Sequence, residues 1–128
     1  MGLLSVAGDV LVGALLWKAL NTAYEQKVHH FGQMYKNSKQ KCKSKPTKEA
    51  RIKCMRQVLS KYYTMRAELE KEMVRELVKG KAPDKKVKVH KQRHLYFKTL
   101  AKVVQDPAVP LYKAPDEAKR RLGIFRLS

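Results

Sequence analysis

A seam of mostly apolar residues runs from Leu3 to Cys42, with spacings that alternate between three and four residues. This is the period of one face of an α-helix, and it predicts a single long helix at the start of the chain. The seam consists of Leu3, Ala7, Val10, Ala14, Trp17, Asn21, Tyr24, Val28, Phe31, Tyr35, Ser38 and Cys42. The other faces are largely apolar before Leu20 and rich in charged residues after it. We therefore expect a helix that begins in apolar surroundings and continues amphipathically into water.

Residues 1–20 form an apolar helix with three interpretations: a membrane span, a helix buried against a partner protein, or a targeting peptide. The segment has no basic residue before Lys18 and no convincing cleavage site, which argues against a targeting peptide. Its nine leucine and valine residues favour insertion by roughly 0.3–0.6 kcal/mol each, whereas Asp9 opposes it by about 2.5–3.5 kcal/mol. A span therefore needs an intramembrane polar contact for Asp9 on a neighbouring helix. Trp17 and Lys18 lie near the end of the segment. In a span they would sit at the membrane–water interface, where tryptophan is enriched and a lysine can extend its charge into water.

A helical hairpin is predicted for residues 21–80, with its turn at 43–47. Pro46 disfavours helical backbone at the preceding residue, and Thr47 is a suitable N-cap for a second helix. Apolar residues of that helix recur at three and four and stop before Gly80, a typical C-terminal glycine. They are Met55, Val58, Tyr62, Met65, Leu69, Met73 and Leu77.

The two cysteines, Cys42 and Cys54, fall on helix faces that should meet across this hairpin. A disulfide that closes so short a loop would stabilise the fold by about 3 kcal/mol. Two packed free thiols are the alternative. A zinc site is less favoured than either, because only these two cysteines are present.

Residues 81–93 are predicted to form an extended basic linker. The sequence Ala82-Pro83-Asp84 predicts a turn, and Val87 and Val89 alternate with lysines in the manner of an extended chain. Five side chains of this linker are candidates for contacts with anionic lipid head groups or nucleic-acid phosphates. They are Lys85, Lys86, Lys88, Lys91 and Arg93. A second basic block, at residues 36–56, has the same chemistry.

Residues 94–128 are expected to form a short helix around His94–Gln105 and then an extended tail. Pro107, Pro110 and Pro115 keep the tail extended up to a last turn or two of helix from residue 116, which Gly123 ends. His90 and His94 have the spacing of two metal ligands on a helix, but no cysteine or carboxylate accompanies them in the sequence. We therefore predict neither a metal site nor a cofactor.

The predicted fold class is all-α and non-globular: an apolar helix, a helical hairpin, a basic strap, a short helix and an extended tail. No nucleophile, general base and orienting group converge in this layout, so we do not expect an enzyme. The net charge of +18 implies an anionic partner, which can be lipid, nucleic acid or the acidic surface of another subunit.

The succession of an apolar helix and basic amphipathic helices is similar to the layout of supernumerary subunits of mitochondrial membrane complexes, in architecture rather than in motif. We expect a non-catalytic accessory subunit of an inner-membrane energy-converting complex, such as a respiratory-chain complex or ATP synthase, that clamps neighbouring subunits and lipid head groups. Positive charge favours the matrix side, where thiols stay reduced, so we expect free Cys42 and Cys54. The alternative function is a basic ribosomal or mitoribosomal protein that binds ribosomal RNA. A bacterial or plastid membrane assembly would explain the same residues.

Overall fold

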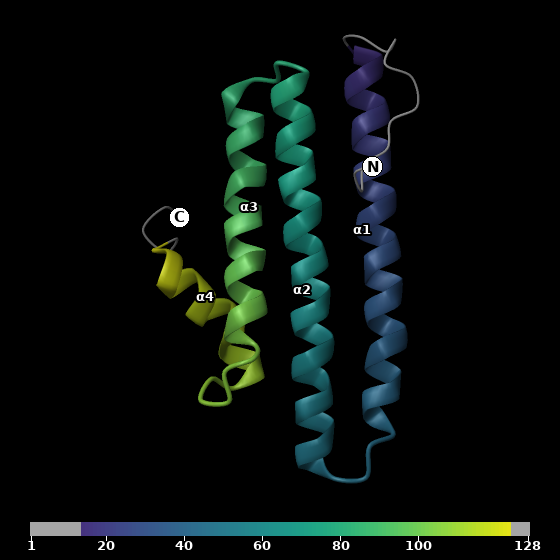
Figure 1. Ribbon diagram of the computed structural model, residues 1–128, viewed down its shortest axis with the longest axis vertical. Coiled ribbons are helices and arrows are strands. Elements are labelled where there is room, and N and C mark those ends of the chain that lie inside the picture. The colour runs from purple at the N-terminus through teal and green to yellow at the C-terminus, as the bar shows by residue number, and fades with distance from the viewer. Residues whose placement is uncertain (1–13, 124–128) are drawn as a thin grey trace.

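The structure is a computed structural model that describes residues 14–123. These residues form four α-helices and one short 3-10 helix (Figure 1). The α-helices are α1 (Ala14–Lys43), α2 (Lys48–Lys79), α3 (Asp84–Val103) and α4 (Ala114–Leu122), and the 3-10 helix is Leu111–Lys113. The three long helices run antiparallel with α2 between α1 and α3, while α4 packs against α3. The predicted all-α class is therefore confirmed for this part of the chain.

The predicted hairpin of α1 and α2 is present, with its turn between Lys43 and Lys48. Thr47 is the N-cap of α2: its backbone is extended (φ −118°, ψ 157°), and its Oγ1 accepts a hydrogen bond of 3.0 Å from the N–H of Ala50. This bond satisfies one of the amide groups that the first helical turn leaves unpaired. The local chemistry that predicted the turn is thus the chemistry that forms it.

Gly80 follows the end of α2 as predicted, but for a different physical reason. Its φ of −84° is ordinary, and the left-handed conformation is taken by the next residue, Lys81, at φ 57°. A Cβ atom on Gly80 would lie 2.8 Å from Cη2 of Trp17, closer than side chains can approach. The glycine is needed because the indole ring packs onto the backbone at this point. That contact fixes the start of α1 against the α2–α3 turn.

The extended basic linker predicted for residues 81–93 is wrong, because α3 begins at Asp84 and continues without a break to Val103. The residues of α3 that face the other helices recur at three and four: Val87, His90, His94, Phe97 and Ala101. Two members of this stripe are histidines, so the stripe is not detected as a pattern of apolar residues. Val89, which suggested an extended alternation, is 40% exposed.

The C-terminal tail, expected to be extended, is folded onto α3 up to Gly123. Ala114 and Ala118 of α4 are buried against α3, and their small side chains allow the two helices to approach closely. Pro115 lies in the first turn of α4, where a missing N–H costs no helical hydrogen bond. Gly123, with φ 72°, ends the helix as predicted.

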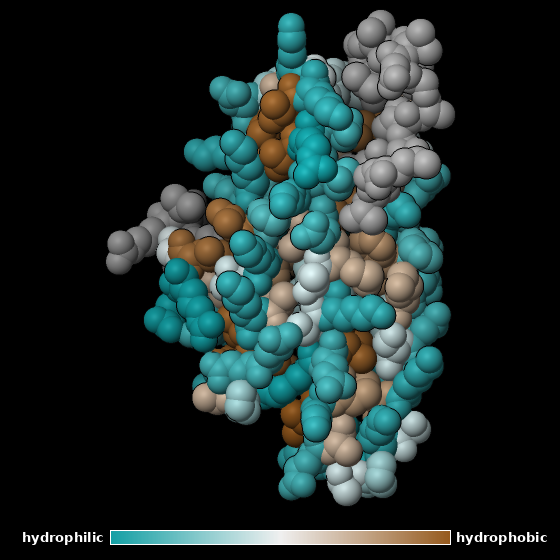
Figure 2. Space-filling model, in the orientation of Figure 1, coloured by the Kyte–Doolittle hydropathy of each residue, from teal (hydrophilic) through white to brown (hydrophobic). Residues whose placement is uncertain are grey.

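Apolar side chains form two cores that share α2 and α3. The first core joins these helices to α1 through Leu20, Phe31, Leu69, Met73, Leu77 and Val87. The second core joins them to α4 through Leu100, Val103, Val104, Ala114 and Ala118. The non-globular arrangement that we expected therefore does not hold for residues 14–123. Outside the cores, hydrophilic side chains cover most of the face shown in Figure 2.

The α3–α4 loop is held in place by Arg56 of α2. Its guanidinium group donates hydrogen bonds to the carbonyl oxygens of Val104 at 3.0 Å, Asp106 at 2.9 Å and Val109 at 3.0 Å. Carbonyl groups at and beyond a helix C-terminus lack partners within the helix, and a cation there also opposes the negative end of the helix dipole. Although Arg56 belongs to the second basic block of the sequence, its charge is used inside the fold.

Candidate functional site

A carboxylate lies fully buried where α1, α2 and α3 meet. Glu70 of α2 accepts a hydrogen bond from the hydroxyl group of Tyr24 on α1, and its Oε1 lies 2.6 Å from Nδ1 of His90 on α3. Its Oε2 is also 3.2 Å from Nη1 of Arg66, one helical turn earlier on α2. A carboxylate only accepts hydrogen bonds, so we assign the proton of the His90 contact to Nδ1. Glu70 thus connects the three long helices.

Arg66 links this polar cluster to both cores. Its guanidinium carbon lies 4.7 Å from the ring centroid of Phe97, in the second core, and 5.8 Å from that of Tyr24, beside the first core. Arg93 of α3 adds a hydrogen bond of 3.4 Å from Nη1 to the Tyr24 hydroxyl group. We call Tyr24, Arg66, Glu70 and His90 the Glu70 cluster. It lies at the boundary between the two cores.

The surroundings of Glu70 favour its charged form. Burial alone would raise the pKa of its carboxyl group, but the hydrogen bonds from His90 and Tyr24 and the charge of Arg66 outweigh burial and lower the pKa below 4.5. For Tyr24, burial and the hydrogen bond to the Glu70 carboxylate both raise the pKa of the phenol above 10.0. Both shifts keep a neutral phenol donating to a charged carboxylate near neutral pH.

The Glu70 cluster has the geometry of a structural network rather than of a reaction centre. A general acid or base must reach a substrate proton, whereas the side chain of Glu70 has no solvent exposure. Each of its oxygens already has a partner. Nη1 of Arg66 is buried without a hydrogen bond and contacts Glu70 only as an ion pair. A buried network that joins three helices in this way favours one packing of them over others.

Cys42 and Cys54 are joined by a disulfide bond, with their Cα atoms 5.4 Å apart. The expectation of two reduced cysteines is therefore wrong for this structure. That expectation came from the assignment to the matrix side, where thiols stay reduced. In the structure, the end of α1 lies against the second turn of α2, and this brings the two cysteines together. The bond ties the two helices together next to their turn.

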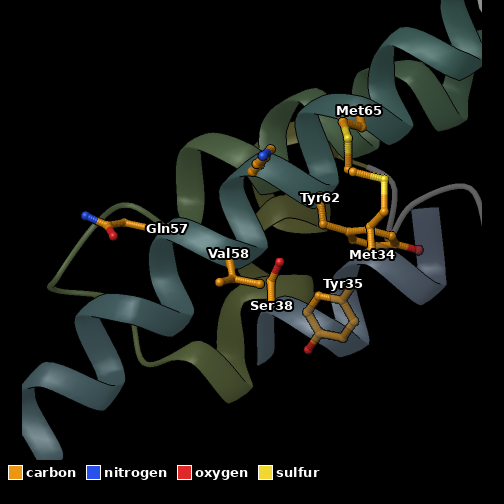
Figure 3. A pocket seen from close by; sticks show the side chains of 8 residues that line it. Met34, Tyr35, Ser38, Gln57, Val58, Tyr62 and Met65 are labelled. Carbon is orange, nitrogen blue, oxygen red and sulfur yellow. The ribbon is translucent and has the colours of Figure 1, made fainter. Parts of the chain in front are cut away.

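A small pocket opens on the α1–α2 seam above the disulfide, with a volume of about 170 Å³. Figure 3 shows Met34 and Met65 meeting on one side of it and Tyr35 beside Ser38 on the other. The ring centroids of Tyr35 and Tyr62 are 5.1 Å apart, and both residues line the pocket. Methionine fills irregular gaps of this kind between helices. Apart from Lys61, the lining residues carry no charge, so the pocket offers no acid–base pair.

The five basic residues singled out on the linker are all exposed, but the helix points them in different directions. Lys86 lies over the Trp17 ring with Nζ at 5.9 Å from the centroid, and Arg93 contacts Tyr24, so both face α1. Lys91 borders a cavity on the α2 side. Lys85 and Lys88 are one helical turn apart on the outer surface. The structure therefore divides the predicted phosphate contacts into separate groups.

His90 and His94 both point at α2 and are used there. His90 contacts Glu70, and Nδ1 of His94 lies 2.9 Å from the carbonyl oxygen of Ala67. Within residues 14–123 no group of three or more histidine, cysteine, aspartate or glutamate side chains has the arrangement of a metal site. The sequence pattern does not predict Glu70 as the partner of His90. Glu70 shares a helix face with Leu59, Tyr63, Val74 and Leu77, and a glutamate among such residues is the sequence signal for a buried ion pair.

The membrane-span prediction falls mainly outside the described residues. Asp9 and its predicted intramembrane contact lie there, and the described part of the apolar segment, Ala14–Leu20, belongs to α1. Among the helices of residues 14–123, none has a stretch that is both long and apolar enough to cross a bilayer. Comparisons of the chain with protein families, with curated proteins and with solved structures find no match.

Proposed function

We propose that the protein is a non-catalytic accessory subunit of a mitochondrial inner-membrane energy-converting complex, such as a respiratory-chain complex or ATP synthase. The apolar segment at the start of the chain, before Trp17, anchors it, with Asp9 paired to a neighbouring helix. The helical bundle clamps adjoining subunits and anionic lipid head groups. The Cys42–Cys54 disulfide favours an oxidising compartment, whereas the positive charge favours the matrix side, to which we assign the bundle. If Cys42 and Cys54 are trapped as a disulfide in freshly lysed cells, the bundle belongs in the oxidising intermembrane space instead.

The observation that carries this proposal is a collar of exposed lysines where the apolar segment joins the bundle. Trp17 packs on Gly80 and under Lys86, so the start of α1 and the α2–α3 turn lie together at one end of the molecule (Figure 1). We call five of the exposed lysines at this end the basic collar: Lys18, Lys81, Lys85, Lys86 and Lys88. A tryptophan in contact with a lysine beside an apolar segment is typical of a chain that meets the head-group region. Each lysine near an anionic surface contributes about 1 kcal/mol.

The non-catalytic character is supported by how the chain uses its ionisable residues. Glu70, His90 and Arg66 are paired with one another at the junction of the helices, and Arg56 holds a loop. The remaining basic residues of the basic collar and of the hairpin turn project outward. These features provide rigidity and positive surface, which suit a role in binding and assembly.

The test is charge reversal of the basic collar, with Lys85, Lys86 and Lys88 all changed to glutamate. We expect less of the complex to assemble, as seen by native electrophoresis of detergent-solubilised membranes, while turnover per assembled complex stays the same. Reversal of Lys41, Lys48 and Lys53 is the matched control, because these exposed lysines lie near the α1–α2 turn, at the other end of the hairpin. An intact complex with lost turnover would instead give the chain a role in the chemistry.

Extraction separates this function from the ribosomal alternative. An anchored subunit should stay in the membrane pellet through high salt and alkaline carbonate and dissolve only in detergent. Release by salt, or sedimentation with ribosomal RNA, would replace the accessory-subunit proposal, because binding to a phosphate backbone falls steeply with salt.

A further inference from the structure

Two adjoining cavities form one groove along the α2–α3 seam, on the side of α2 away from α1. The first has a volume of about 310 Å³ and is bordered by Lys71, Lys98 and Lys102. The second has a volume of about 270 Å³ and is bordered by Val74 and Leu95. Lys71 and His94 border both cavities, so the two spaces meet at these residues. Their combined size is that of a small-ligand site.

The first cavity is built to attract an anion. Within residues 14–123 its three lysines form no ion pair, and Glu68 is the only carboxylate on its border. Nδ1–H of His94 donates to the carbonyl oxygen of Ala67, which fixes the ring on the border of this space, with Nε2 as the acceptor nitrogen of the neutral imidazole. Thr64 and Gln105 add polar groups to the wall. Several cationic donors around one space suit a phosphate group.

The second cavity has an apolar wall that is partly exposed to solvent. Leu95 is 50% exposed there, although it is a large aliphatic side chain on a well-formed helix. Val74 faces it from α2, and the alkyl chains of Lys71 and Lys91 complete the wall. Such a surface gains free energy when an apolar group covers it. The basic and apolar halves lie end to end along the helices.

We infer that this groove binds one anionic amphiphile, with a phosphate group held by Lys71, Lys98 and Lys102 and an acyl chain laid over Val74 and Leu95. The basic collar contacts a membrane surface, whereas the groove takes a single lipid molecule. The inference deepens the proposed function and rests on it for the presence of anionic lipid around the protein. Charge complementarity selects the head group, and the adjoining apolar wall selects a lipid over a free phosphate.

The experiment is calorimetric titration of the purified full chain with decyl phosphate below its micellar concentration, and with inorganic phosphate. We expect saturable binding of one decyl phosphate per chain and much weaker binding of inorganic phosphate. Loss of two charged donors in the variant Lys98→Gln/Lys102→Gln should weaken decyl phosphate binding by about tenfold or more. The variant Leu95→Asn should weaken decyl phosphate binding and leave inorganic phosphate unaffected. All three positions are exposed, so the variants should fold.

Two controls keep the groove and the basic collar apart. The collar variant with Lys85, Lys86 and Lys88 changed to glutamate should bind decyl phosphate through its unaltered groove, and Lys48→Gln/Lys53→Gln removes two charges far from it. If Lys48→Gln/Lys53→Gln weakens decyl phosphate binding as much as Lys98→Gln/Lys102→Gln does, the binding reflects general charge attraction and the inference is overturned. Absence of saturable binding would overturn it too, as would equal binding of inorganic phosphate that Leu95→Asn does not change. None of these results depends on assembly of the complex.

Discussion

Glu70 illustrates how one residue can decide the arrangement of three helices. Its carboxylate is the shared acceptor for a phenol from α1 and an imidazole from α3, and it neutralises Arg66 on its own helix. None of these partners lies within three residues of it in the sequence. The ion pair could have been predicted because Glu70 shares a helix face with Leu59, Tyr63 and Val74. The identity of its partners could not, because that depends on how α1 and α3 pack on α2.

Replacement of Glu70 by alanine should destabilise the protein strongly. The change leaves the buried Arg66 guanidinium without its carboxylate, and the loss of one partner of a buried pair costs about 3–5 kcal/mol. Urea unfolding followed by circular dichroism measures the difference. Glu68→Ala, on the exposed face of the same helix, is the control and should change stability by at most about 0.5 kcal/mol. Equal stability of the two variants would contradict the structural role of the Glu70 cluster.

The same carboxylate should make the protein sensitive to acid. The pKa of Glu70 is lowered on folding from its usual value of 4.5, so its contribution is fully present above that value. The contribution is then lost as the pH falls through the folded-state pKa, where the carboxylate becomes protonated. The melting temperature should therefore decrease as the pH is lowered below about 5. The variant Glu70→Gln should show a shallower decrease, and an unchanged pH profile would assign the acid sensitivity to other carboxylates.

At the scale of elements, the sequence predicts a helix well where its buried face is apolar. The limits of the hairpin turn follow from Pro46 and Thr47, whose effects on the backbone are local. The apolar pattern does not predict the first half of α3, because His90 and His94 occupy its buried face. A histidine is buried at acceptable cost only when a partner accepts or donates a hydrogen bond, and those partners, Glu70 and Ala67, belong to another helix.

Arg56 should control the order of the loop that joins α3 to α4. Arg56→Met keeps the aliphatic chain and removes three hydrogen bonds to carbonyl groups, which should cost about 1.5–3 kcal/mol. Hydrogen exchange should accelerate at residues 104–113 and in α4, and remain unchanged in α1. Lys53→Met, an exposed substitution one turn earlier, should leave the exchange pattern as it is. Uniform acceleration along the chain would mean that Arg56 acts on global stability alone.

The disulfide should stabilise the α1–α2 hairpin. It closes a loop with a sequence separation of 12 residues, for which the chain-entropy estimate is about 3 kcal/mol. Reduction with dithiothreitol should therefore lower the urea midpoint of the wild-type protein. The variant Cys42→Ser/Cys54→Ser should start at the lower midpoint and no longer respond to the reductant. A wild-type midpoint that dithiothreitol does not move would show that the bond adds no stability.

At the scale of the whole molecule, the helices contribute unequally to the two cores. α2 and α3 contribute to both cores, whereas α1 belongs to the first and α4 to the second. Such a fold should open from its outer helices before it unfolds globally. Native-state hydrogen exchange should therefore show the highest protection in the middle of α2 and α3 and lower protection in α1 and α4. Equal protection in all four helices would indicate a single cooperative unit.

Trp17 is the only tryptophan of the chain, and it lies on Gly80 in the middle of the basic collar. The protein therefore carries its own fluorophore at the junction between the apolar segment and the bundle. Emission wavelength reports detachment of α1 from the α2–α3 turn without any label. Quenching by brominated acyl chains reports how deep that junction lies in a bilayer. One spectroscopic signal thus follows both the docking of a helix and the approach of the protein to a membrane.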